Sequence, residues 1–230
     1  MSKAANLDKK SLAVKAIIRF LSALLIIGCF LFIPAGTFNY WNGWLFIGSI
    51  FIPMISVLIY LLIKDPELLE KRFKTEEKEK EQRFIQKIGI APTIIGFLLP
   101  GFDYRLNWSN VPMWLVVIAT ILVVLGYILF IIVMKQNSYA SRVIEIQQDQ
   151  KVIDYGLYSK VRHPMYLAAI IIMLSSPLVL GSYYALIPMA FYPLIIIFRI
   201  KNEEEVLKKG LTGYEAYLKK VKYRLIPFIW

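Results

Sequence analysis

Long apolar runs constrain this chain of 230 residues more than any other feature of its sequence. A helix needs about 20 predominantly apolar residues to cross the roughly 30 Å of hydrocarbon in a bilayer. We predict six such spans, the last two of them short and interrupted by prolines. They comprise residues 12–34, 43–63, 88–102, 112–134, 164–180 and 184–199. Because 58% of the residues are hydrophobic, the predicted fold class is all-α, a multi-pass transmembrane helical protein.

The last two predicted spans and the tail behind them have patterns of their own. Only a few residues around Gly181 separate the two spans, which predicts a C-terminal helical hairpin. After residue 199, apolar side chains such as Leu211, Tyr214 and Leu218 recur at helical spacing, with lysines on the other side. This pattern predicts an amphipathic tail helix on the cytosolic membrane surface.

Lysine and arginine are distributed unevenly between the segments that join the apolar runs. If the N-terminus lies in the cytosol, the segments on that side contain every one of the 27 basic residues except Arg105. These segments are 1–19, 64–87, 135–162 and 199–230. Cytoplasmic loops carry such an excess, so we predict both termini in the cytosol. Four tryptophans lie at the predicted outer ends of the spans, where an interfacial aromatic belt would place them. They are Trp41, Trp44, Trp108 and Trp114.

Charge and residue usage argue against three kinds of partner or site: nucleic acid, a disulfide framework and a metal site. The net charge of +11 belongs to segments that face membrane lipids, so no nucleic acid is expected. One cysteine, Cys29, excludes an intramolecular disulfide framework, and one histidine, His163, excludes HExxH and other sites with two imidazoles. We therefore predict no metal site. The mixed charges of residues 64–87 are interpreted as a solvated, salt-bridged cytosolic helix without chemistry.

The first polar cluster, GLYSKVRHPMY at 156–166, directly precedes the fifth predicted span. Pro164 suits the first position of a helix, which places His163 at or near the N-cap. Arg162 then lies beside the positive end of a helix dipole, where a carboxylate or phosphate ligand would be stabilised. The alternative interpretation is an arginine that reaches the lipid headgroups and a histidine that caps the helix.

The second cluster, RIKNEEEVL at 199–207, lies where the sixth predicted span leaves the membrane. Arg199 and Glu203 are one helical turn apart and can pair. Three consecutive glutamates are unfavourable beside an anionic leaflet unless a positive group is held there. A bound cation would account for them, whereas a solvated helix start with surface ion pairs is the alternative.

The predicted hairpin would return both clusters to the same depth on the cytosolic side. Arginine, histidine and tyrosine would then face arginine and glutamates across one pocket. Such a pocket suits a zwitterionic ligand that carries a carboxylate and positive groups, of which S-adenosylmethionine is one example.

At these residues the sequence resembles the isoprenylcysteine carboxyl methyltransferase family of integral membrane, S-adenosylmethionine-dependent methyltransferases. The resemblance covers roughly residues 150–230 and rests on three motifs in order. They are G-x-Y with RHPxY (Gly156, Tyr158 and 162–166), R-x-x-x-EE-x-x-L (Arg199, Glu203, Glu204 and Leu207), and G-x-E-x-Y with a closing RLIP (213–217 and 224–227).

The resemblance implies that the chain is a single domain, 1–230, whose two parts have different functions. N-terminal membrane helices and a cytosolic loop would occupy 1–134, and the cofactor-binding methyltransferase core 135–230. Arg199 would hold the substrate carboxylate, with Arg162 as a second candidate, and Glu203 completes the implied catalytic set. The implied cofactor-binding residues are Gln150, Lys151, Val152, Ile153, Tyr158, His163, Pro164, Met165, Tyr166, Glu203 and Glu204. No glycine-rich turn follows a strand, so a Rossmann-type cofactor site has no support in the sequence.

The predicted activity is methylation of the carboxylate of a lipophilic, isoprenylcysteine-like substrate that enters from the bilayer. A carboxylate nucleophile needs no general base, whereas an amine or a thiol does, and the clusters contain few candidate bases. The alternatives are a phospholipid N-methyltransferase or a small-thiol S-methyltransferase with the same cofactor site, a nicotinamide-dependent membrane reductase, and an inactive scaffold. The active site is expected on the cytosolic side of the plasma membrane in a bacterium, or of the endoplasmic reticulum in a eukaryote.

Overall fold

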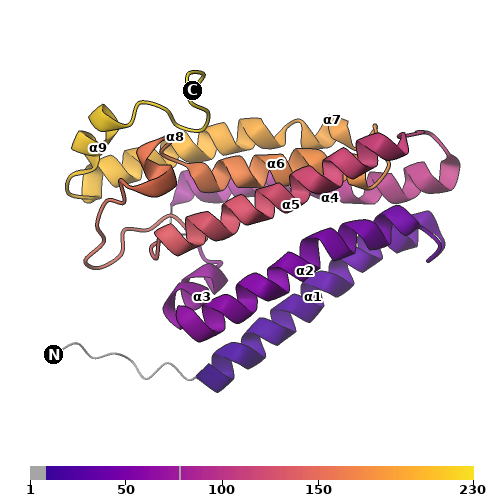
Figure 1. Ribbon diagram of the computed structural model, residues 1–230, viewed down its shortest axis with the longest axis horizontal. Helices are drawn as coiled ribbons and strands as arrows, with labels where there is room; N and C mark the ends of the chain where they lie inside the picture. Colours follow the sequence, from indigo (N-terminus) through magenta and orange to yellow (C-terminus); the bar gives the residue numbers. More distant parts are fainter. Residues whose placement is uncertain (1–8, 78) are drawn as a thin grey trace.

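The computed structural model describes residues 9–77 and 79–230. The predicted cytosolic start of the chain, residues 1–8, lies outside this part. All regular elements of the described residues are helices (Figure 1). They are α1 Lys9–Ala35, α2 Trp41–Lys64, α3 Pro66–Phe73, α4 Lys80–Leu106, α5 Met113–Gln136, the 3-10 helix η1 Gly156–Ser159, α6 Pro164–Val179, α7 Leu186–Met189, α8 Tyr192–Gly210 and α9 Tyr214–Lys220. The predicted all-α fold class is confirmed for this part of the chain.

Four of these helices have the length and apolar composition of membrane spans: α1, α2, α4 and α5. They coincide with the first four predicted spans along the chain. Large aliphatic side chains such as Leu25, Ile33 and Ile52 are exposed on their outer faces. Contiguous apolar surface of this kind is unfavourable in water and suits contact with lipid.

The fifth and sixth predicted spans differ from the prediction. Residues 164–180 correspond to α6, an apolar helix of 16 residues, which is shorter than a usual span. Residues 184–199 do not form one helix, because α7 ends at Met189 and α8 begins anew at Tyr192 and continues to Gly210. Pro193 lies in the first turn of α8, the part of a helix where proline is tolerated. The count of six spans is therefore not confirmed, and neither is a simple hairpin.

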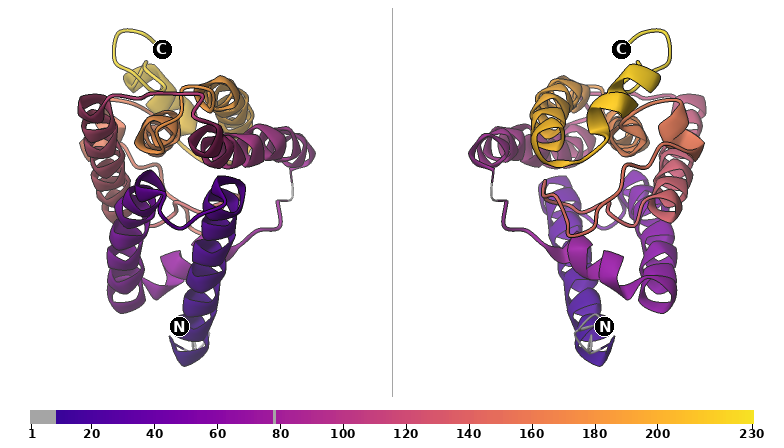
Figure 2. Two further views of the ribbon diagram at one scale, coloured as in Figure 1. Left: turned by 90° about the vertical axis from the view of Figure 1, so that its right-hand side faces the viewer. Right: turned by 90° about the vertical axis from the view of Figure 1, so that its left-hand side faces the viewer.

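The helices pack around a core in the middle of the bundle. In the end views of Figure 2, α1 and α2 lie below α4, α6 and α8, and α5 runs beside α6 and α2. The core between them consists of buried aliphatic and aromatic side chains, among them Leu31, Phe46, Phe97, Val123 and Leu180. Helix α4 approaches α1 so closely at Gly101 that a Cβ there would lie 2.6 Å from the carbonyl oxygen of Leu31. A larger residue would push these two helices apart.

The prediction of one solvated helix over residues 64–87 is wrong. The side chain of Asp65 accepts a hydrogen bond of 3.0 Å from the backbone of Leu68 and starts α3, with Pro66 in its first turn. Leu68 and Leu69 are buried against the ends of α2 and α5. The chain then leaves the helical conformation before α4 begins at Lys80. The many charged residues of this segment predicted a solvated helix and gave no sign of the apolar face of α3.

The tail forms a shorter helix than its periodicity predicts, and that helix has a different partner. The short helix α9 and its flanks bury Leu211, Tyr214 and Val221 against Val152 and Leu207. The apolar face of the tail therefore covers another part of the protein. Its predicted position on the membrane surface is not supported.

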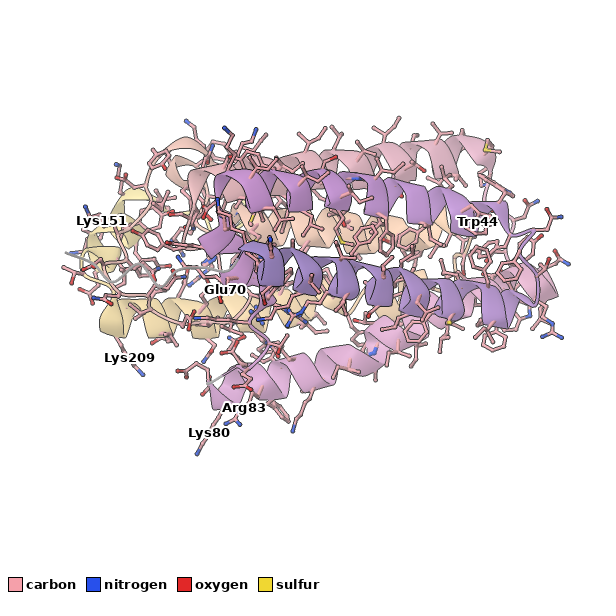
Figure 3. The ribbon with its side chains drawn as sticks, turned by 90° about the horizontal axis from the view of Figure 1, so that it is seen from below. Trp44, Glu70, Lys80, Arg83, Lys151 and Lys209 are labelled. Carbon is pink, nitrogen blue, oxygen red and sulfur yellow. The ribbon has the colours of Figure 1, made fainter. Side chains whose placement is uncertain are left out.

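The two ends of the bundle differ in the residues that they present. Figure 3 places Lys80, Arg83, Lys151 and Lys209 at one end and Trp44 at the other. This separation is what the predicted orientation requires, although the orientation itself stays a prediction.

Candidate active site

A polar pocket lies at the end of the bundle that carries the basic residues. It is surrounded by the segment 137–153, here called the pocket loop, together with η1, the start of α6, the charged half of α8, and α9. The pocket and its open mouth enclose about 870 Å³ of empty space.

Most of the predicted site residues line this pocket. They are Gln150, Lys151, Val152, Ile153, Tyr158, Arg162, His163, Met165, Tyr166, Arg199 and Glu203. Two predicted cofactor ligands do not line it, namely Pro164 and Glu204. The structure therefore gathers residues from both sequence clusters around one space. Their assigned roles stay predictions.

The start of α6 has the predicted arrangement of backbone but not the predicted cap. Pro164 occupies the first turn and His163 the N-cap position, yet the imidazole makes no capping hydrogen bond. The backbone N–H groups of Arg162 and His163 instead donate to the carbonyls of Tyr223 and Arg224, at 3.0 and 2.9 Å. The C-terminal segment thereby fixes the turn that leads into α6.

Glu204 lies behind the pocket and binds three basic side chains. Its carboxylate oxygens lie 2.7 Å from Nε of Arg162, 2.9 Å from Nε of Arg224 and 3.3 Å from Nε2 of His163. Burial opposes ionisation, but the hydrogen bond and charge of His163 together with the arginines outweigh it and lower the pKa of Glu204 to about 2. Glu204 is therefore an ionised structural link between α8, the start of α6 and the C-terminal segment.

Glu203 and Arg199 face the pocket and are joined through a third side chain. The hydroxyl of Tyr166 donates to Oε2 of Glu203 and accepts a hydrogen bond of 2.8 Å from Nε of Arg199. Arg199 also donates to the carbonyl of Arg142 in the pocket loop, at 2.7 Å. The sequence suggested a direct pair between Arg199 and Glu203, whereas the structure inserts Tyr166 between them. The pocket wall thus presents a cation and an anion held at a fixed separation.

Further tyrosines line the pocket, and of Tyr158, Tyr214 and Tyr217 only the first was predicted as a site residue from the sequence. Burial raises the pKa of Tyr158 to about 12, and its hydroxyl accepts a hydrogen bond of 2.9 Å from Nδ2 of Asn137. Tyr217 donates to the carbonyl of Tyr158 at 2.7 Å. Tyr214, on α9, also lines the pocket. The third motif contains Tyr214 and Tyr217, and that was the available signal for them.

Helix α3 and the residues after it hold the pocket loop in place. Lys74 forms an ion pair of 2.6 Å with Glu145, and Oε2 of Glu77 accepts a hydrogen bond of 3.2 Å from the backbone of Ile144. A segment interpreted as having no chemistry therefore supports one wall of the candidate site.

Within residues 9–77 and 79–230, the chain forms a helical bundle with four candidate membrane spans and a polar pocket at one end, and this architecture is that of a membrane protein. Residues 117–209 match the family model of the isoprenylcysteine carboxyl methyltransferase (ICMT) family. This match confirms the resemblance that the motifs indicate, and the family implies a membrane methyltransferase. No curated protein matches the chain significantly.

Proposed function

We propose that the pocket binds S-adenosylmethionine and that the protein methylates the carboxylate of a lipophilic, isoprenylcysteine-like acceptor. The observation that carries this proposal is the row Arg199, Tyr166 and Glu203 on one pocket wall. A carboxylate such as Glu203 attracts the positive groups of the methyl donor, and a guanidinium such as Arg199 attracts an acceptor carboxylate. One pocket therefore offers complementary charge to both reactants.

The remaining lining supports a nucleoside-containing methyl donor. Val152, Ile153 and Leu207 supply apolar surface, and Tyr214 and Tyr217 supply aromatic rings. Aromatic side chains can stack on the flat face of a base. Glu203 is partly accessible, with 24% of its side chain exposed, so it can reach a charged group in the pocket.

Methyl transfer to a carboxylate makes modest demands on these residues. The bound donor would supply an electrophilic methyl group on a sulfonium sulfur. The oxygen–carbon bond forms as the sulfur–carbon bond breaks, and no proton has to move. This balance suits a pocket in which the imidazole of His163 is already engaged with Glu204 at 3.3 Å. The protein mainly orients the acceptor and excludes water.

Arg199 is the better placed of the two predicted carboxylate ligands. Arg162 directs Nε to Glu204 and Nη1 to the carbonyl of Val221 at 2.8 Å, so its donors serve the fold. We therefore assign the acceptor carboxylate to Arg199. Arg162 keeps a role in shaping the pocket.

The proposed acceptor reaches the pocket from the membrane side. A second cavity between α4, α6 and α8 shares Met165, Tyr166 and Arg199 with the pocket. Because basic residues gather at this end of the bundle, we place the pocket on the cytosolic side. The methyl donor would then enter from the cytosol and the acceptor from the bilayer.

The proposal is tested with purified protein in detergent, S-adenosylmethionine labelled in its methyl group, and N-acetyl-S-farnesylcysteine as the acceptor. We expect label in the product that base releases, as it releases a methyl ester. Arg199→Ala and Glu203→Ala should both lose turnover, whereas Glu205→Ala, an exposed neighbour that does not line the pocket, should keep it. Unchanged turnover in both pocket variants, or a label stable to base, would contradict the proposal.

A further inference from the structure

Arg72, at the end of α3, lies where two further cavities meet. The first, here called the apolar chamber, is an open cavity between α1, α2, α3, α5 and α6 with about 1150 Å³ of empty space, part of it open solvent. Its lining is mostly apolar, with side chains such as Phe20, Leu58 and Ile172, and its charged members are Arg19 and Arg72. The second is the cavity between α4, α6 and α8, whose lining also includes Arg199. Arg72 lines both. It is therefore a charged group on the boundary between the apolar chamber and the cavity that contains Arg199.

Arg72 contacts the proposed donor pocket through a neighbouring side chain. Its Nη1 lies 3.6 Å from Sδ of Met165, a residue that lines the pocket. The guanidinium also lies over the ring of Phe130, 5.3 Å from its centre. These contacts connect Arg72 to the wall of the pocket.

The charge of Arg72 has no counter-ion among the described residues. No carboxylate lies within ion-pair distance of it. Besides its contact with Sδ of Met165, Nη1 makes long hydrogen bonds to the carbonyls of Ala140 and Ser141, at 3.4 and 3.3 Å. Nε and Nη2 donate no hydrogen bond within residues 9–77 and 79–230. Burial, reinforced by the positive charge of Arg142, lowers the pKa of Arg72 to about 10. The group thus stays charged at neutral pH in surroundings that disfavour its charge.

Arg72 is partly buried. A cation that is partly withdrawn from water gains from an anionic partner, because desolvation without a partner is unfavourable. The charged side chains that act on the pKa of Arg72, Arg142 and Arg199, have the same sign as Arg72. A ligand that brings a negative group to this place would satisfy the free donors of Arg72. The adjoining chamber, whose lining is mostly apolar, suits a ligand with a hydrocarbon tail.

We propose that Arg72 binds the acceptor carboxylate together with Arg199, while the hydrocarbon tail of the acceptor occupies the apolar chamber. This inference rests on the proposed function and adds to it a second residue that binds the acceptor carboxylate. Arg72 lies outside the residues 117–209 that match the family model. The N-terminal part of the chain therefore supplies a residue that determines specificity.

The test compares wild type, Arg72→Gln and the control Lys71→Gln. Lys71 also contacts the pocket loop, at the carbonyl of Ser138, but lines neither cavity. Two quantities are measured: the Kd for S-adenosylhomocysteine, and the ratio between the inhibition constant of N-acetyl-S-farnesylcysteine amide and the KM of the corresponding acid. The ratio reports how strongly the protein prefers a carboxylate to a neutral group of the same shape.

We expect the ratio to fall on the order of 10- to 100-fold in Arg72→Gln, because a charge-assisted interaction is lost. The Kd for S-adenosylhomocysteine should stay within about twofold of wild type, and Lys71→Gln should keep the wild-type ratio. If Arg72→Gln weakens S-adenosylhomocysteine and leaves the ratio unchanged, Arg72 only supports the pocket loop and the inference is overturned.

A second variant keeps the test decisive if Arg72→Gln does not fold. Arg72→Lys retains the charge but replaces the planar guanidinium, which can bind a carboxylate with two parallel hydrogen bonds, by a compact ammonium. The ratio should therefore still fall, by a smaller factor. An unchanged ratio in Arg72→Lys then contradicts the inference. Absence of any base-labile methyl product from the wild-type protein would instead overturn the proposed function.

Discussion

Arg162 and Glu204 form a buried ion pair of 2.7 Å between residues that are 42 positions apart in the sequence. The first residue comes from the RHPxY motif and the second from the EE motif. Arg224, from the closing RLIP motif, binds the other oxygen of the same carboxylate at 2.9 Å. All three motifs therefore meet at one side chain. They preserve a structural link behind the pocket as well as the pocket itself.

This link predicts a large loss of stability in Glu204→Gln. The substitution leaves two arginines beside a neutral amide, and breaking a buried ion pair by removal of one partner costs about 3–5 kcal/mol. Thermal unfolding in detergent should show a clearly lower Tm for Glu204→Gln. Glu205→Gln, at an exposed neighbouring position, should unfold like wild type. Equal Tm values for Glu204→Gln and wild type would show that the ion pairs of Glu204 do not stabilise the fold.

The same carboxylate predicts a dependence of stability on pH. Folding lowers its pKa from 4.5 to about 2. At pH values between these two pKa values, the folded state therefore binds fewer protons than the unfolded state. The stabilisation is therefore complete above pH 4.5 and is lost as the pH falls toward 2. Between these values the Tm of wild type should fall more steeply than that of Glu204→Gln. Parallel slopes would show that Glu204 titrates normally in the folded protein.

Tyr166→Phe should impair the site and leave the fold nearly intact. The substitution removes the hydroxyl that connects Arg199 to Glu203, and each lost hydrogen bond to a charged group is worth about 1.5–3 kcal/mol. We expect turnover to fall at least tenfold while the protein still shows a cooperative melting transition. Tyr183→Phe, at the opposite end of the bundle, is the control and should retain turnover. Full activity in Tyr166→Phe would show that the connection is dispensable.

The orientation predicts which introduced cysteines a membrane-impermeant thiol reagent can reach. Cys29 is the only cysteine, so Cys29→Ser provides the background. In intact cells, Phe38→Cys, in the exposed turn between α1 and α2, should be labelled. Lys209→Cys, at the basic end of the bundle, should be labelled only after the membrane is opened. The reverse pattern would invert the proposed topology.

Much of the fold could be predicted because a bilayer imposes a length on apolar helices. That constraint located α1, α2, α4 and α5, but it carries no information about where a short helix near the pocket ends. Residues 184–199 were apolar enough for a span, yet the chain starts a new helix near Pro193. Likewise, the charges around α3 concealed Leu68 and Leu69, whose burial depends on helices distant in the sequence.

The candidate site could be predicted as a set of residues but not as a set of roles. Glu203 and Glu204 are adjacent and chemically identical, so the sequence could not distinguish them. Packing does so, because Arg162 and Arg224 surround one carboxylate and leave the other facing the pocket. Arg72 was missed for a related reason, since its missing counter-ion is visible only when every neighbour is placed.

The most direct test of the account measures two constants in Glu203→Gln and Arg199→Gln: the Kd for S-adenosylmethionine by equilibrium dialysis, and the KM for N-acetyl-S-farnesylcysteine. Glu203→Gln should weaken S-adenosylmethionine roughly tenfold or more and leave the KM near the wild-type value. Arg199→Gln should raise the KM by a similar factor and leave the Kd unchanged. If both variants bind S-adenosylmethionine like wild type, or if the two effects are exchanged, the proposed division of charge between donor and acceptor is wrong.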